Sequence, residues 1–310
     1  MRSLLLYLVC FGLLISCSSN AKKPESPYIL VLGIAQDAGY PQINCEKKCC
    51  KSVYKFPSHK RMVSSLALVD PISNKEWVFD ATPDFSEQLK LLNNATGKSA
   101  DLPEGIFLTH AHMGHYTGLM YVGREAMSSE SLDVYAMPRL KNYLETNGPW
   151  SQLVTLDNIE LKELQQMRPV KLADGITVTP IEVPHRDEFS ETVGYLIAAN
   201  SKQVLFIPDI DKWHLWEHSL VDLVQQVDYA FLDATFYKDG EINRPMSEVP
   251  HPFVEESMDL LKNLSDEHKN KVHFTHMNHS NPLLLKGSAA QKEVKSQGFQ
   301  IAREGVKYAL

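Results

Sequence analysis

The 310-residue sequence lacks several features that mark other classes of protein. It has no block of like charge, and its formal net charge of −7 argues against a nucleic-acid partner bound through phosphate contacts. It also has no internal repeat, low-complexity tract or linker. With 44% hydrophobic and 22% charged residues, the composition is that of a soluble globular chain large enough for one generous core.

The N-terminus carries the one long apolar run, which extends from Leu4 to Ile15 behind Arg2. This run is too short to span a bilayer and has the layout of a secretory signal. It ends in Leu-Ile-Ser-Cys17, which resembles a bacterial lipobox with Cys17 as the lipidated residue. We therefore expect an exported lipoprotein of the bacterial cell envelope, held at the membrane by that lipid, although a plain cleaved signal or an uncleaved anchor are alternatives. The expected parts are a signal peptide at 1–16, a tether at 17–27 and one folded domain at 28–310.

Cysteine is scarce. Of five cysteines, Cys10 and Cys17 belong to the N-terminal segment, so three remain: Cys45, Cys49 and Cys50. An odd number does not suit the disulfide framework of an exported protein. Their close spacing favours part of a metal site, with a disulfide from Cys45 to Cys49 or to Cys50 as the alternative.

Histidine, in contrast, is concentrated. The segment Thr109–His115 contains three histidines directly after the apolar run Gly105–Leu108, so the cluster lies where a buried strand ends. Neutral imidazole binds zinc, iron or copper. The alternative is a polar, histidine-rich turn, but unpartnered histidines are uncommon in a core.

The same placement recurs along the chain, because polar residues follow one apolar strand after another. Strands at the same sheet edge would bring these side chains together, and open coordination positions would mark a catalytic metal. Taken alone, Asp209 could instead cap a helix. The predicted helices include a single one over 213–226, on which His214 and His218 are read as surface positions. The residues that follow apolar strands are Asp80, His110, His185, Asp209, Asp233 and His276.

These residues carry a family resemblance. The segment THAHMGHYTGL at 109–119, together with the strand-end residues, resembles the metal-binding motifs of the metallo-β-lactamase superfamily. The segments 81–84, 233–236 and 275–282 resemble the pyrroloquinoline-quinone (PQQ) biosynthesis protein B family. The resemblance implies an α+β fold, a four-layer αββα sandwich with metals at one edge of both sheets. It implies one metal on His110, His112 and His185, and a second on His115, Asp209 and His276.

The sequence departs from the superfamily pattern at Gly114, where that pattern has an aspartate. Glycine offers no ligand. We therefore expect the second site to lose one carboxylate and one negative charge, so that the second ion binds weakly or the centre holds a single ion.

A related branch, the cyclic phosphodiesterases of the carbon–phosphorus lyase pathway, carries a structural zinc on a cysteine-rich loop and a histidine. By that resemblance, we expect a structural zinc on Cys45, Cys49, Cys50 and His279. The same branch implies that His251 protonates the leaving group, a task for which a histidine pKa is suited; the alternative is a loop histidine in solvent. Asp80 and Asp209 are expected to act with His251 as catalytic residues.

The expected function is a hydrolase in which zinc, or alternatively manganese or iron, activates water toward an ester, amide or phosphodiester in a small-molecule substrate. Two alternatives stand beside it. One is an iron-dependent oxidase or hydroxylase of PQQ-biosynthesis type. The other is a metal-binding lipoprotein without turnover.

Overall fold

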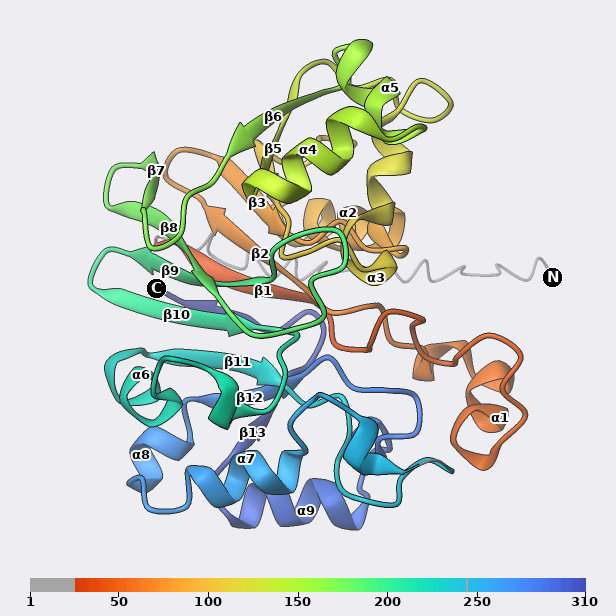
Figure 1. Cartoon of the computed structure of the whole chain (residues 1–310), viewed down its shortest axis with the longest axis vertical. Helices are drawn as coiled ribbons and strands as arrows, with labels where there is room; N and C mark the ends of the chain where they lie inside the picture. The colour runs from red at the N-terminus through yellow and green to blue at the C-terminus, as the bar shows by residue number, and fades with distance from the viewer. Residues whose placement is uncertain (1–25, 244) are drawn as a thin grey trace, which may run out of the picture.

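The computed structural model describes residues 26–243 and 245–310, whose strands form two seven-stranded sheets (Figure 1). The expected signal peptide, Cys17 and all but the last two residues of the tether lie outside the described residues. Among the helices of the described ranges, none combines the length and the apolar character needed to cross a membrane.

The first sheet is built mainly from the N-terminal half of the chain. Strand β14 comes from the C-terminus and pairs with β1, with Tyr28 opposite Ala309. Neighbours from β3 to β6 run parallel. In sheet order the strands are β14 (Lys307–Ala309), β1 (Tyr28–Gly33), β2 (Ser65–Asp70), β3 (Lys75–Phe79), β4 (Gly105–Phe107), β5 (Leu132–Ala136) and β6 (Ile159–Glu163).

The second sheet is built from the C-terminal half. Neighbours from β10 to β13 run parallel, whereas β7, β8, β9 and β10 pair antiparallel. In sheet order the strands are β13 (Gln300–Ile301), β12 (Val272–Thr275), β11 (Tyr229–Asp233), β10 (Lys202–Ile207), β9 (Val193–Ala199), β8 (Ile176–Glu182) and β7 (Val170–Ala173).

The two sheets pack face to face because their strands alternate apolar side chains between two buried faces. In β1, Ile29 and Val31 belong to the core that includes the second sheet, whereas Tyr28 and Leu30 belong to the core on the outer face. Aromatic rings join the sheets: the ring centroid of Phe79 lies 5.4 Å from that of Tyr195. Burial on both faces explains the continuous apolar runs seen in the sequence.

Helices cover both outer faces, which confirms the predicted four-layer αββα sandwich. Residues of α2, α4 and α5 join the core outside the first sheet, and residues of α6, α7 and α9 join the core of the second. The α-helices are α1 (Lys48–Lys55), α2 (Phe85–Thr96), α3 (Met113–Tyr116), α4 (Pro138–Thr146), α5 (Trp150–Thr155), α6 (Leu220–Gln226), α7 (Val254–Leu260), α8 (Asp266–Lys269) and α9 (Ala289–Ser296). The 3₁₀ segments are η1 (Pro57–His59), η2 (Thr117–Val122), η3 (Trp213–Leu215), η4 (Met246–Glu248) and η5 (Pro282–Leu284).

The predicted single helix over 213–226 is wrong. The chain forms η3, becomes extended at Trp216 with ψ 136°, and restarts as α6, whose N-cap Ser219 accepts a hydrogen bond from the Asp222 amide. The indole Nε1 of the buried Trp216 donates to the Glu182 carbonyl at 2.8 Å, so this extended residue contacts the end of β8. His214 and His218 therefore do not lie one turn apart on a helix.

Glu304 ties the C-terminal loop to the segment before β2. Its Oε1 accepts a hydrogen bond from the Met62 amide at 2.6 Å. Burial raises the pKa of Glu304 from its ordinary value of 4.5 to about 7, against the opposing effects of the Met62 amide and of Arg61. The folded chain thus holds a proton on Glu304 at pH values where the unfolded chain has released it.

Because the folded pKa is the higher one, Glu304 makes the protein less stable as pH rises from about 4.5 to about 7. We expect Glu304→Gln to remove this loss and to increase the free energy of unfolding at pH 8 by about 1–2 kcal/mol relative to wild type. At pH 4.5 the gain should vanish. Urea unfolding at both pH values measures it, with the exposed Glu267→Gln as control; an equal effect of Glu304→Gln at both pH values would contradict this account.

Candidate metal centre

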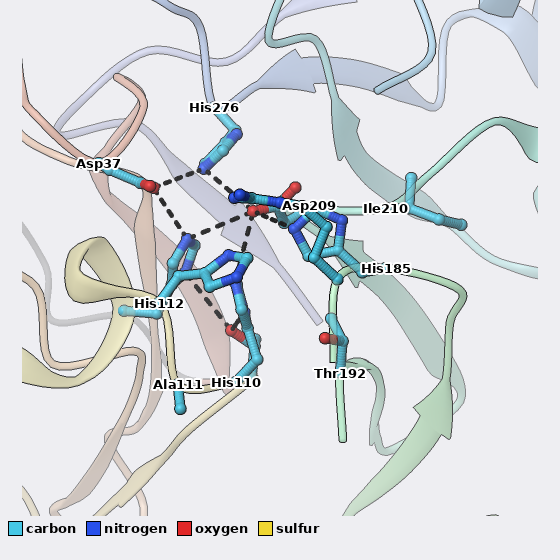
Figure 2. A network of polar contacts seen from close by, with 12 residues as sticks. Asp37, His110, Ala111, His112, His185, Thr192, Asp209, Ile210 and His276 are labelled. Carbon is cyan, nitrogen blue, oxygen red and sulfur yellow. Dashed lines mark hydrogen bonds and ion pairs between the residues drawn. The ribbon is translucent and has the colours of Figure 1, made fainter. Parts of the chain in front are cut away.

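Side chains from both sheets converge at one edge of the sandwich (Figure 2). Two groups of four potential ligands form there, and within each group the ligand atoms lie within 4.8 Å of one another; Asp209 also forms a smaller group with Asp233 and His251. Asp209 belongs to both groups. The first group is His110, His112, His185 and Asp209, and the second is Asp37, His115, Asp209 and His276.

The sheet topology explains this convergence. His110 follows β4, Asp209 follows β10 and His276 follows β12, so each side chain emerges where a strand ends. His276 and the buried Asp80 both have positive φ, 59° and 69°. Such backbone costs on the order of 1 kcal/mol for a non-glycine residue and is concentrated at functional sites, because the strained residue is held by its surroundings.

The spacing of the ligand atoms fits a metal ion. Oδ2 of Asp209 lies 3.4 Å from Nε2 of His110 and 3.3 Å from Nε2 of His185. Zinc ligands about 2.1 Å from a tetrahedral ion lie about 3.4 Å from one another. The same Oδ2 lies 3.8 Å from Nε2 of His115 and 4.0 Å from Nε2 of His276. This single oxygen therefore stands between both groups, as a bridging carboxylate does.

Four of the five imidazoles are held through Nδ1, which leaves Nε2 facing the centre. Outer-shell hydrogen bonds of this kind fix the ring orientation and tautomer of metal-binding histidines. The four contacts are His115 to Asp80 at 2.7 Å, His185 to Asp211 at 2.9 Å, His110 to Thr109 at 2.9 Å and His276 to Thr235 at 2.9 Å.

His112 has the reverse arrangement. Its Nε2 lies 3.3 Å from the Glu188 carboxylate, and its Nδ1 is buried. Among the described residues, Nδ1 of His112, Nε2 of His110 and Nε2 of His185 have no hydrogen-bond partner although all three are buried. Buried polar atoms are normally partnered. Three such atoms in one ligand group therefore show that these residues fit a cation.

The charges of the centre are strongly coupled. Burial lowers the pKa of His185, but the carboxylates of Asp209 and Asp211 outweigh this effect and raise the pKa to about 9. Burial and the neighbouring His115 hold the pKa of His110 well below its usual range. For Asp209, burial is outweighed by the surrounding imidazoles, which hold its pKa well below the ordinary value. The centre is thus arranged around an ionised carboxylate.

Asp37 was absent from the residues expected from the sequence. Its Oδ1 lies 3.2 Å from Nε2 of His115 and 3.3 Å from Nε2 of His276. The second group therefore contains a carboxylate besides that of Asp209, although residue 114 is glycine. The sequence signal was present, since Asp37 follows the apolar strand β1 just as the other polar residues follow theirs.

Asp80 does not reach the centre. It is fully buried and its carboxylate accepts hydrogen bonds from the Thr109 amide and the Thr109 hydroxyl, besides holding His115. The structure thus corrects the expectation that Asp80 is catalytic: it is a positioning residue for the histidine segment.

His251 does lie at the centre. Its Nδ1 is 3.0 Å from Asp209 and 2.9 Å from Asp233, and its side chain retains 8% exposure. Burial lowers the pKa of His251, but Asp209 and Asp233 together raise it well above its usual range. A histidine held by Nδ1 presents Nε2 as its free proton-carrying atom. The alternative of a loop histidine in solvent does not match this buried position.

The three cysteines and His279 form another group of potential ligands, separate from the centre around Asp209. All three are free thiols, and Sγ of Cys45 lies 4.0 Å from Sγ of Cys49. Thiolates bound to one tetrahedral zinc at 2.3 Å are about 3.8 Å apart. Burial raises the pKa of Cys50 to about 12, so a bound cation would have to displace its proton. The four residues fit a closed structural site.

Known proteins resemble the chain over most of its length. A family model described as "Beta-lactamase superfamily domain" matches residues 76–277. Coenzyme PQQ synthesis protein B of Rhizobium meliloti (strain 1021) is 26% identical over 312 positions, covering 91% of this chain and 97% of that protein.

Two solved structures share the fold. Zn(2+)-bound PqqB from Methylobacterium extorquens superposes with a TM-score of 0.76 at 22% identity, covering 91% of this chain and 100% of that one. A diphosphatase from the PhnP family superposes with a TM-score of 0.63 at 23% identity, covering 92% of this chain and 98% of that one. At these identities the likeness shows the fold alone.

The cysteine group leads to a prediction about zinc content. We expect one zinc ion per chain to resist brief treatment with a chelator, because four protein ligands leave no open coordination position. Cys49→Ser should lose this ion and lower the melting temperature, whereas Lys48→Ala on the same helix should keep it. Elemental analysis after gel filtration measures the content; chelator-resistant zinc that persists in Cys49→Ser would contradict the assignment.

Proposed function

The chain belongs to the beta-lactamase superfamily, and from that membership we propose that it is a metal-dependent hydrolase acting on an ester, amide or phosphodiester of a small-molecule substrate. The observation that carries the proposal is the position of Asp209 Oδ2, within 4.0 Å of an imidazole nitrogen from each of His110, His115, His185 and His276. A shared carboxylate between two groups of imidazoles serves cation binding and has no equivalent use in packing.

The residues that would hold the first ion are His110, His112, His185 and Asp209. Those for a second are His115, Asp209, His276 and Asp37. Imidazole and carboxylate ligands suit zinc, with manganese or iron as alternatives. A divalent ion bound there supplies Lewis-acid activation of water and of a substrate oxygen.

The protein's own contribution is orientation and proton transfer. Asp80, Asp211, Thr109 and Thr235 each hold one imidazole ring through Nδ1, which orients four of the ligands before an ion binds. His251 is held by Asp233 and Asp209 through Nδ1. Its Nε2–H is then available to donate a proton to the leaving group.

The substrate class rests on the relatives and is part of the proposal. A structural neighbour is a diphosphatase, so phosphodiesters and phosphoanhydrides are the first substrates to test, followed by esters and lactams. The curated relatives are PQQ synthesis proteins, which keeps an iron-dependent oxidation as the second candidate. Metal analysis of protein purified without oxygen separates the two, since iron would favour redox chemistry and zinc or manganese would favour hydrolysis.

The proposal is tested with a substrate panel on the metal-loaded protein. We expect turnover of at least one hydrolysable substrate, and its loss in His112→Ala because the first ion loses a ligand. A metal-loaded wild type that turns over no member of the panel, or equal turnover in His112→Ala, would contradict the proposal. The former result would favour a metal-binding protein without turnover.

His251 allows a sharper prediction. We expect His251→Gln to lower kcat by about 10²–10⁴-fold on a phosphodiester with an alkoxide leaving group. The loss should be small on a 4-nitrophenyl ester, because that leaving group departs without a proton. Metal content should be unchanged, and the exposed His214→Gln serves as control. An equal loss on both substrates would remove His251 from the role of proton donor.

We also propose that the protein is an exported lipoprotein anchored through Cys17. The support is the lipobox-like sequence alone. In a bacterial host, Cys17→Ser should abolish incorporation of labelled palmitate and move the protein from the membrane fraction to the soluble fraction. Unchanged fractionation and labelling would rule out the lipid anchor.

A further inference from the structure

At the second ligand group, Asp37 fills the space that a side chain at position 114 would need. A Cβ atom added to Gly114 would lie 2.5 Å from Cα and 2.5 Å from Oδ1 of Asp37. No real Cβ makes contacts this short, and one of the two atoms belongs to the backbone, so a side chain at 114 and Asp37 in its present position exclude each other. Asp37 can therefore lie at the second ligand group only because residue 114 is glycine.

Asp37 is held in this position by its neighbours along the chain. On its N-terminal side, the amides of Ala35 and Gln36 donate to the carbonyls of Met62 and Met277, each at 2.9 Å. On its C-terminal side, the Gly39 amide closes a turn onto the Gln36 carbonyl at 2.7 Å. Gly39 has φ 70°, in the left-handed region where glycine carries no Cβ penalty. The loop is thus tied to the segment before β2 through Met62 and to the residue after His276 through Met277.

The carboxylate reaches the same two imidazoles that define the second group. Oδ1 lies 3.2 Å from His115 and 3.3 Å from His276, close to the spacing of about 3.4 Å between ligands of a tetrahedral ion. Its side chain is 30% exposed, whereas those of His115 and His276 are fully buried. Asp37 therefore closes the solvent side of this group.

The charge balance points the same way. Without Asp37, the carboxylate of Asp209 alone would serve both ligand groups. With Asp37, the second group has two imidazoles, one carboxylate of its own and one shared carboxylate. An added negative charge at this distance strengthens binding of a divalent cation, because the buried centre screens it weakly.

We infer that Asp37 is a ligand of the second metal ion, replacing from a different loop the carboxylate that Gly114 cannot provide, so that the centre holds two ions. The inference rests on the proposed function, because it assumes that the first group also binds a metal. It reverses the expectation of a weak or absent second ion that followed from Gly114.

The experiment counts ions and does not depend on activity. Protein stripped of its active-site metal is titrated with Mn²⁺, and the ions are followed by elemental analysis and by electron paramagnetic resonance, in which two neighbouring manganese ions give a spin-coupled signal. We expect wild type to bind two ions in the centre and to show the coupled signal. Asp37→Ala should weaken the second ion at least 10-fold and lose the coupling while keeping the first. His276→Ala should lose the same ion.

The exposed Asp101→Asn removes the same charge remote from the centre and should behave as wild type. Gly114→Asp tests the inference by adding a carboxylate at position 114 instead of removing the one at position 37. The superfamily pattern alone would predict tighter binding of the second ion, whereas the contact of the new Cβ with Asp37 predicts weaker binding. Circular dichroism spectra that match wild type establish that each variant is folded.

The failures of the two proposals are distinguishable. Two ions with wild-type affinity in Asp37→Ala, or a stronger second ion in Gly114→Asp, would overturn the role of Asp37 while leaving a metal-dependent hydrolase intact. A single ion in wild type would likewise overturn only the inference. A wild-type centre that binds no ion would overturn both the inference and the proposed function.

Discussion

The structure depends on the placement of one buried carboxylate among five imidazoles. Asp209 is almost fully buried, and an ionised carboxylate in that position is tolerated only when opposite charge or hydrogen-bond donors surround it. The imidazoles that surround it come from both sheets. The two sheets therefore meet at this edge through the side chains that form the candidate centre, whereas the apolar core between them supplies their packing.

This arrangement explains the buried polar residues behind the centre. Asp80, Thr109 and Thr235 are buried and Asp211 is partly exposed; each of the four fixes the ring of a histidine. The positive φ values of Asp80 and His276 are backbone strain at the ends of their strands. The two strands that precede these residues, β3 and β12, each have a neighbouring strand on both sides, which holds the backbone in place. The cost is offset by packing elsewhere in the two cores.

Much of the site could be predicted from the sequence because its residues follow a simple rule. Polar residues directly after buried apolar strands lie at one sheet edge, and His110, His185, Asp209 and His276 were all found in this way. Two predictions were wrong because the sequence does not show which groups a side chain will contact. Asp80 follows the rule but points back at Thr109 and His115. His214 and His218 were placed on one helix, whereas the chain is extended at Trp216, whose indole bonds to Glu182. Sequence periodicity does not reveal which carbonyl an indole will reach.

The sequence by itself determined the strand ends, the histidine cluster and the membership of a superfamily, because these are properties of local pattern: apolar periodicity, residue type and spacing. Only the tertiary structure decided that Asp37 takes the space beside Gly114, since 77 positions separate the two residues along the chain. Their relation is a contact of 2.5 Å between a hypothetical Cβ and a backbone atom. Exclusion of one side chain by another is a property of volume in three dimensions. No local pattern carries that information.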